Sequence, residues 1–200
     1  MATIFEQILI DSQKVGNDAP TSKQAVDWLR QQALKLKNVN PNGLIAEAVG
    51  NKRLTGLTDE SVGQMFMFSY DPKLKGVLPY YDQFPLVFPI EYYGNSFLGI
   101  NLHYLPPMLR AKLMDSLMST INNKKYDKTT KLVLSYKILK NASRFKYFQP
   151  CLKKYLFSNV KSPFVYISPN EWNIALMLPT EKFVGASKSQ VYKDSTSMVG

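Results

Sequence analysis

The chain has 200 residues, a formal net charge of +10 and an apolar content of 45%. With 12 tyrosines and 11 phenylalanines it is too aromatic for a disordered polycation, and its length suits one domain or one domain with an appended helical arm. A single cysteine, Cys151, and a single histidine, His103, exclude a disulfide framework and leave too few ligands for a Cys- or His-based metal site. We therefore expect no metal and no cofactor.

Residues 1–60 are expected to form an N-terminal helical arm. Thr3 and Glu6 make a capping-box pattern, which predicts a helix at the start of the chain. Thr21 and Gln24 repeat the pattern after a proline and predict a second helix. A short third helix and a loop should complete the arm.

Residues 61–200 are expected to form an α+β domain. Five short apolar segments predict strands at 64–70, 86–93, 96–104, 164–167 and 173–178. Gly94 and Asn95 are a tight-turn signal, so the second and third of these strands should form a hairpin. Strands and helices do not alternate, which argues against a parallel sheet. The predicted fold is a small five-stranded antiparallel barrel or curled sheet, SH3-like, with N-terminal helices and an inserted basic helical segment.

The inserted segment spans about 107–161 and predicts three helices. Leucine or isoleucine recurs at every fourth position from 109 to 121, which predicts a helix over 107–122. Asp127 is a candidate cap for the second helix, and Pro150 for the start of a shorter third one through residue 157. A weak helix is expected after Thr180.

Neither end of the chain nor its interior predicts a membrane protein. The N-terminus has no positive region ahead of an apolar stretch, so no signal peptide is expected. No apolar run approaches the roughly 20 residues that a membrane helix needs. We expect a protein that is made in the cytoplasm and has no membrane partner.

The positive charge is confined to one part of the sequence. Thirteen Lys and Arg residues and two acids lie between 109 and 161, a net charge of +11, whereas the rest of the chain sums to −1. Such segregation predicts a partner of dense negative charge, either a nucleic-acid backbone or an acidic protein. Lysines outnumber arginines, so a DNA contact should be independent of sequence. The candidate contact residues are Lys124, Lys125, Lys128, Lys131, Lys137, Lys140, Arg144, Lys146, Lys153 and Lys154.

Aromatic residues and prolines are concentrated in two stretches outside the basic segment. These are LPYYDQFPL at 78–86 and FLGINLHYLPP at 97–107. Stiff loops of this composition make interface anchors when they are exposed, and they cover the end of a barrel when they are buried. The candidate interface residues are Tyr80, Tyr81, Phe84 and Tyr104.

No stretch of the chain has the pattern of a catalytic motif. His103, Asp82 and the Tyr80-Tyr81 pair could form an acid–base cluster, as a small-barrel nuclease would need, but a lone strand histidine is more often a packed residue. The other acids are scattered one per segment and do not supply the paired carboxylates of a metal-dependent nuclease. We therefore predict that the protein is not an enzyme and has no catalytic residues.

Several of these segments together resemble a known family. The strings YDPK at 70–73, LPYYDQFPL at 78–86 and FLGINLHYLPP at 97–107 resemble virion structural proteins of large contractile-tailed bacteriophages, such as those of marine cyanobacteria. The resemblance extends through RFKYF at 144–148 and NEW at 170–172. Within these phage proteins, the DNA end protector family is the one it indicates.

The resemblance implies a non-enzymatic virion protein near packaged DNA, in the head, neck or inner tail, that protects the ends of the genome. It also implies other virion proteins as partners, an oligomeric state in the particle, and double-stranded DNA as a ligand. One alternative is a tail, baseplate or head–tail connector component whose basic helices dock on acidic virion proteins. A small-barrel nuclease is the third hypothesis.

Overall fold

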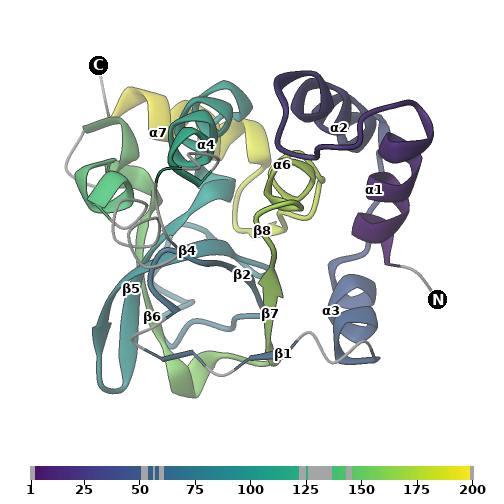
Figure 1. The fold of residues 1–200 in the computed structure, drawn as a ribbon. Coiled ribbons are helices and arrows are strands. Elements are labelled where there is room, and N and C mark those ends of the chain that lie inside the picture. The colour runs from purple at the N-terminus through teal and green to yellow at the C-terminus, as the bar shows by residue number, and fades with distance from the viewer. Residues whose placement is uncertain are drawn as a thin grey trace.

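The structure is a computed structural model that describes residues 3–50, 54, 55, 57, 58, 61–121, 125, 137–142 and 146–198. A sheet occupies one side of the molecule, and helices lie along its upper side and to its right (Figure 1). The expected α+β class is confirmed by this arrangement of helices and antiparallel strands.

Three helices form the N-terminal part, namely α1 (Ile4–Lys14), α2 (Lys23–Lys35) and α3 (Pro41–Gly50). The capping box of α1 is confirmed: the Thr3 amide donates to Glu6 Oε2 at 2.8 Å, and the Glu6 amide donates to Thr3 Oγ1 at 3.2 Å. The cap of α2 is one residue later than predicted. Its N-cap is Ser22, whose hydroxyl accepts from the Ala25 amide.

The main sheet is antiparallel and has the strand order β1-β7-β2-β4-β5-β6. Its strands are β1 (Leu54–Thr55), β2 (Met65–Met67), β4 (Leu86–Tyr93), β5 (Ser96–Asn101), β6 (Leu152–Leu156) and β7 (Phe164–Ile167). A separate two-stranded sheet joins β3 (Tyr81–Asp82) to β8 (Phe183–Val184). The predicted hairpin is confirmed, because β4 and β5 pair across Gly94-Asn95 and Gly94 has a φ of +53°.

The sheet is curled and not closed. Phe68 follows β2, yet its ring lies 5.3 Å from that of Tyr155 on β6 and 4.8 Å from that of Phe164 on β7. Rings from distant strands therefore meet on the concave face, where Phe97 is also fully buried. Because β1 and β6 remain at the two edges, the barrel alternative is wrong and the curled sheet is confirmed. The SH3-like topology stays a prediction.

Two predicted elements are wrong in type. Residues 173–178 are not a strand, because they contain the short helix α6 (Trp172–Ala175), in which the Ala175 amide donates to the Glu171 carbonyl at 2.9 Å. A short, fully buried apolar run has no periodicity that separates strand from helix. Pro150 lies inside a 3-10 turn, Lys146–Cys151, instead of starting an α-helix, and the chain continues as β6 paired with β5.

The strand predicted over 96–104 ends three residues early. Asn101 terminates β5, and Leu102–Tyr104 form a 3-10 turn. The turn begins there because the Asn101 side-chain oxygen accepts from the His103 amide at 3.0 Å, a local bond that competes with the ladder of the sheet. The strand predicted over 64–70 is likewise shorter, since only Met65–Met67 pair as β2.

The helices after the hairpin follow the expectations in part. The predicted helix over 107–122 is confirmed as α4 (Pro107–Ile121). Of the second basic helix, residues 137–142 are described and are helical. The last helix, α7 (Lys188–Ser197), begins after β8 and is capped by Ser187, whose hydroxyl accepts from the Gln190 amide. Among the described helices, none combines the length and apolar character needed to cross a bilayer.

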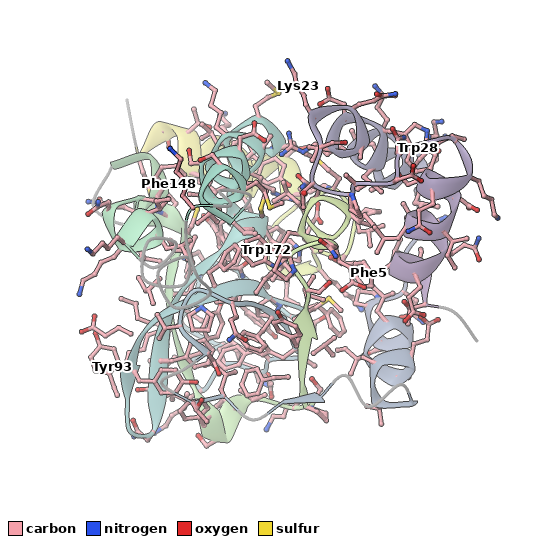
Figure 2. All side chains as sticks on the ribbon, viewed as in Figure 1. Phe5, Lys23, Trp28, Tyr93, Phe148 and Trp172 are labelled. Carbon is pink, nitrogen blue, oxygen red and sulfur yellow. The ribbon has the colours of Figure 1, made fainter. Side chains whose placement is uncertain are left out.

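Two hydrophobic cores lie on the two faces of the sheet. The larger one joins the sheet to the helices and includes Trp172, which lies at the centre of the molecule with its indole N–H donating to the Ile167 carbonyl (Figure 2). Arg30 on α2 donates to the Asn173 side chain at 2.9 Å, so α2 is held against α6. The smaller core is the aromatic cluster of the concave face, which contains Phe68 and Phe97.

Because β4 and β5 approach each other closely at Gly99, we predict that a larger residue does not fit there. A Cβ at this position would lie 2.3 Å from Val87 Cγ1 and 3.2 Å from the Phe88 carbonyl oxygen. We expect Gly99→Ala to lower the free energy of unfolding by about 1–3 kcal/mol, measured by urea denaturation. Gly76→Ala is the control, because a Cβ there has no neighbour within 4 Å. Equal stability of the two variants would contradict the packing at Gly99.

Candidate nucleic-acid interface

A pocket lies between the loop ahead of β3 and the edge strand β6. Its volume is about 240 Å³, and it opens where the curled sheet meets the two-stranded sheet. Its lining residues are mainly aromatic or basic: Tyr70, Tyr80, Tyr81, Tyr104, Tyr155, Lys153 and Lys154, together with Pro72, Leu78, Asp82 and Leu152. We call it the Tyr–Lys pocket.

The two-stranded sheet holds the aromatic side of the Tyr–Lys pocket in place. Tyr81 pairs with Val184, and the adjacent Gly185 has a φ of +92°, a conformation that favours glycine. A Cβ on Gly185 would lie 2.5 Å from the Pro79 carbonyl oxygen. The β8 turn therefore packs directly against the backbone that carries Tyr80.

Asp82 ties this loop to three other segments. Its Oδ1 accepts from the amides of Phe84 at 3.1 Å and Lys182 at 3.3 Å. Its Oδ2 accepts from Asn101 Nδ2 at 3.1 Å and lies 2.7 Å from His103 Nδ1. Four groups thus surround one carboxylate that is 3% exposed, and the loop has little freedom to move.

The Asp82 network continues through His103 to Thr180. His103 Nε2 lies 3.2 Å from Thr180 Oγ1, so the three side chains form an acid–imidazole–hydroxyl chain. The sequence pointed to Asp82 and His103 as a candidate acid–base pair, and the structure does bring them together. However, none of the three residues is more than 3% exposed, so a substrate has no access to the hydroxyl. The chain of hydrogen bonds has the features of an internal brace.

Three aromatic contacts position the tyrosine rings of the Tyr–Lys pocket. The Tyr80 and Tyr104 rings lie 6.1 Å apart at an angle of 32°. The Phe183 ring meets both of them edge-on, 6.4 Å from Tyr80 and 5.1 Å from Tyr104. Burial raises the pKa of the Tyr104 hydroxyl far above its ordinary value, so this ring stays neutral and apolar.

Lys153 supplies the positive charge inside the pocket. Its Nζ lies 4.1 Å from the centroid of the Tyr104 ring, which is a cation–π contact. Burial lowers the pKa of this ammonium group from the ordinary lysine value. Within the described part of the chain, no carboxylate forms an ion pair with Lys153. The site therefore presents a partly desolvated cation next to an aromatic ring.

Lys154 also lines the pocket, but its side chain leaves β6 in the direction opposite to that of Lys153, because successive residues of a strand point in opposite directions. Its Nζ lies 4.8 Å from the centroid of the Tyr93 ring, near the tip of the β4–β5 hairpin. Figure 2 shows Tyr93 at the edge of the molecule farthest from the helices. Lys154 is exposed, so its charge can reach a partner from the outside.

The other predicted contact residues are placed only in part. Lys137 and Lys140 lie on the helical segment 137–142, where Lys137 is exposed, and Lys125 lies in an exposed turn. The backbone of Lys146 is described in a 3-10 turn. Lys124, Lys128, Lys131 and Arg144 lie outside the described residues.

Of the four predicted interface aromatics, three line the Tyr–Lys pocket, namely Tyr80, Tyr81 and Tyr104. Phe84 does not, because it is 5% exposed and packs in the larger core. Cys151 is buried as well, and burial raises the pKa of its thiol to about 12, which leaves no reactive thiolate. Among the described residues, no group of three or more His, Cys, Asp or Glu is arranged to hold a metal ion.

A second buried polar cluster anchors the C-terminal segment above the site. Arg110 donates to the carbonyls of Leu105 at 2.7 Å, His103 at 3.1 Å and Leu176 at 3.1 Å. It also lies 3.9 Å from Glu181, which pairs with Lys188. Burial alone would raise the pKa of Glu181, but His103, Arg110 and Lys188 outweigh it and lower the pKa to about 2.

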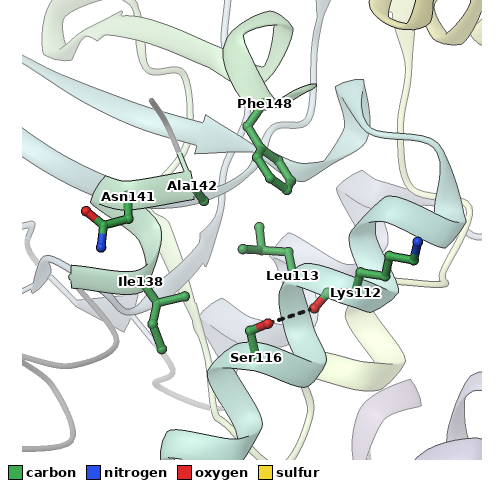
Figure 3. Close-up of a pocket in the computed structure, with 7 residues that line it drawn as sticks. All are labelled: Lys112, Leu113, Ser116, Ile138, Asn141, Ala142 and Phe148. Carbon is green, nitrogen blue, oxygen red and sulfur yellow. Dashed lines mark hydrogen bonds between the residues drawn. The ribbon is translucent and has the colours of Figure 1, made fainter. Parts of the chain in front are cut away.

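A second pocket of about 350 Å³ lies between α4 and the residues Ile138, Asn141, Ala142 and Phe148, and it differs from the Tyr–Lys pocket in chemistry (Figure 3). Leu113, Ile138 and Phe148 face one another across it, whereas the Lys112 side chain points away from them. It is larger, but its walls offer apolar contact without a charged group directed inward. The Tyr–Lys pocket is the stronger candidate site because aromatic and basic residues converge there.

Residues 37–198 match the family described as Phage T4 terminal DNA protecting protein. The matched range includes every residue that lines the Tyr–Lys pocket. No curated protein and no solved structure matches the chain.

The Asp82 network predicts a large loss of stability when its acceptor is removed. Asp82→Ala would remove the shared partner of the Phe84 and Lys182 amides, Asn101 and His103, three of which are buried, so we expect the free energy of unfolding to fall by about 3–5 kcal/mol. Asp71→Ala is the matched control, because Asp71 pairs with Lys75 at the surface and should contribute less than about 1 kcal/mol. Urea denaturation of both variants tests this, and similar losses would contradict the bracing role of Asp82.

The lowered pKa of Glu181 predicts a loss of stability in acid. A carboxyl group whose folded pKa is about 2, against 4.5 ordinarily, stabilises the fold fully above pH 4.5 and loses this contribution as the pH falls towards 2. We expect Glu181→Gln to be less stable than wild type by roughly 3 kcal/mol at pH 7 and by progressively less below pH 4.5. Thermal melts between pH 2 and 7 measure the difference. Glu47→Gln, at an exposed site on α3, is the control, and its difference in stability from wild type should be the same at every pH. A pH-independent difference for Glu181→Gln as well would refute the lowered pKa of Glu181.

Proposed function

We propose that this chain, which belongs to the bacteriophage family of the Phage T4 terminal DNA protecting protein, binds the ends of phage double-stranded DNA and shields them from nucleases. The observation that carries the proposal is the placement of Lys153 and Lys154 on an edge strand beside a pocket of tyrosines, within the family-matched range. The segment that contains them also holds the excess positive charge of the chain.

The chemistry of these residues supports binding without sequence preference. A lysine ammonium is a point charge that neutralises a phosphate and releases a condensed counterion, but it does not read base edges in the bidentate manner of arginine. Lys154 and Lys137 are exposed and can reach a phosphate backbone without rearrangement of the core. Affinity should therefore depend steeply on salt and weakly on DNA sequence.

Protection in this proposal is physical. A protein that occupies the last base pairs of a duplex denies an exonuclease the terminus that it must engage, and no bond is made or broken. The Asp82–His103–Thr180 chain supports a non-enzymatic role because its hydroxyl is buried. We further propose that the protein is made in the host cytoplasm, acts near packaged DNA in the head, neck or inner tail of the virion, and contacts other virion proteins there as an oligomer.

Binding to linear and circular DNA of the same sequence tests the proposal. We expect the purified protein to bind a blunt linear duplex more tightly than a closed circle, to protect the linear form from an exonuclease, and to lose affinity as salt rises. A flat salt response would contradict phosphate binding. Absence of DNA binding, together with a stable complex with an acidic virion protein, would favour the tail or baseplate alternative.

The two exposed lysines, Lys137 and Lys154, predict a graded loss of affinity. The double variant Lys137→Ala/Lys154→Ala should weaken binding to every duplex alike and reduce the slope of log affinity against log salt by up to about two. Lys23→Ala, at an exposed position on α2 before the matched range, should leave both quantities unchanged. Fluorescence anisotropy over a salt series gives the slopes. An unchanged slope for the double variant would show that neither lysine contacts a phosphate.

A further inference from the structure

The size of the Tyr–Lys pocket limits what it can hold. Its volume of about 240 Å³ is below the roughly 300–1,000 Å³ of pockets for drug-sized ligands. The space suits one flat ring system and excludes an intact base pair. A duplex end that merely abuts the surface would therefore leave the pocket unfilled.

The walls of the pocket favour a flat, unsaturated ligand. The Tyr80 and Tyr104 rings are 6.1 Å apart and tilted by 32°, and Tyr80 is only partly buried, so ring surface faces the pocket. Phe183 holds both rings by edge-on contacts. Asp82 accepts from the Phe84 amide and so fixes the backbone of the loop that carries Tyr80. The rings are thus preorganised, and a ligand need not order them on binding.

The charge in the pocket favours a ligand that also carries an anion. Lys153 has no carboxylate partner within the described part of the chain, and its Nζ lies over the Tyr104 ring. The acid among the lining residues, Asp82, already receives two backbone amides and the Asn101 side chain and lies beside His103. A planar ring attached to a phosphate would complement both Tyr80 and Lys153.

We propose that the Tyr–Lys pocket binds a single unpaired nucleobase at the end of a DNA strand, with the adjoining phosphate at Lys153. The inference rests on the proposed function, because it assigns a ligand to the same surface. The terminal base is the one that leaves the stack at least cost, and stacking on tyrosine accepts any base, since every base has a π face. The pocket would thus distinguish an end from internal duplex without reading sequence.

The first test compares two DNA ends that differ only in one base. One duplex carries a single-nucleotide overhang with its base, and the other carries an abasic overhang of the same charge, each prepared with the overhang on the 3′ or on the 5′ strand. For at least one polarity we expect the protein to bind the end with the base at least about fivefold more tightly. Equal affinity for both ends at both polarities would overturn the pocket assignment and leave the proposed function standing, whereas no binding to any duplex would overturn both.

Variants assign the preference to the pocket. Tyr80→Leu should bring the ratio of the affinities for the overhang with its base and for the abasic overhang close to one, because it removes a stacking surface. The leucine keeps an apolar side chain at this position. Lys153→Met should reduce affinity for the overhang that carries a base more than for a blunt duplex. Tyr166→Leu is the matched control, since Tyr166 is a partly buried tyrosine of β7 that packs against Phe66 and does not line the pocket, and its ratio should equal that of the wild type.

Two results would reject the assignment even if wild type prefers the end with a base. A wild-type ratio retained by both Tyr80→Leu and Lys153→Met would place the base elsewhere. A ratio lost equally in Tyr166→Leu would show that the effect is not specific to the pocket. Thermal melts of the three variants confirm that each is folded at the temperature of the binding measurement.

Discussion

The carboxylate of Asp82 is the point at which the loop of the candidate site, the sheet and the C-terminal segment are joined. It accepts from a backbone amide of its own loop, from the end of β5 through Asn101, and from the Lys182 amide a hundred residues later. His103 continues the connection to Thr180. A buried carboxylate is costly to desolvate, so the fold depends on all of these partners being present together. The tyrosines that flank Asp82 gain their fixed positions from this one group.

Two sets of aromatic residues have different roles in the molecule. Phe68, Phe97 and their neighbours fill the concave face of the sheet, where edge-on and stacked rings exclude water. Tyr80 and Tyr81 lie at the rim, partly exposed, with hydroxyl groups that tolerate solvent. The sequence alone does not separate the sets, because both lie in dense aromatic runs. The two sets differ in burial, and Phe84, which was predicted at the interface, belongs to the buried set.

Local signals in the sequence were sufficient where local interactions decide the structure. The capping box at Thr3, the Gly94-Asn95 turn and the four-residue spacing in α4 each involve neighbouring residues, and each prediction is confirmed. β6 was missed because Pro150 is a common signal for a helix start, whereas the pairing that makes Lys153 part of a strand comes from β5, fifty residues away. Likewise, no sequence pattern indicates that Tyr80 and Lys153 share a pocket. That proximity arises only when the sheet curls and β8 pairs with β3.

The pairing of β3 with β8 also sets the order in which the protein can mature during synthesis. The loop with Tyr80 is translated about a hundred residues before Lys182 and Gly185, which hold it through the Asp82 and Pro79 contacts. The sheet from β2 to β7 can pair on the ribosome, since domains fold as their residues emerge. The site cannot, because Phe183, whose ring packs edge-on against Tyr80 and Tyr104, is translated after the whole of that sheet. A nascent chain that ends before Phe183 therefore lacks the edge-on contacts that hold Tyr80 and Tyr104 in place.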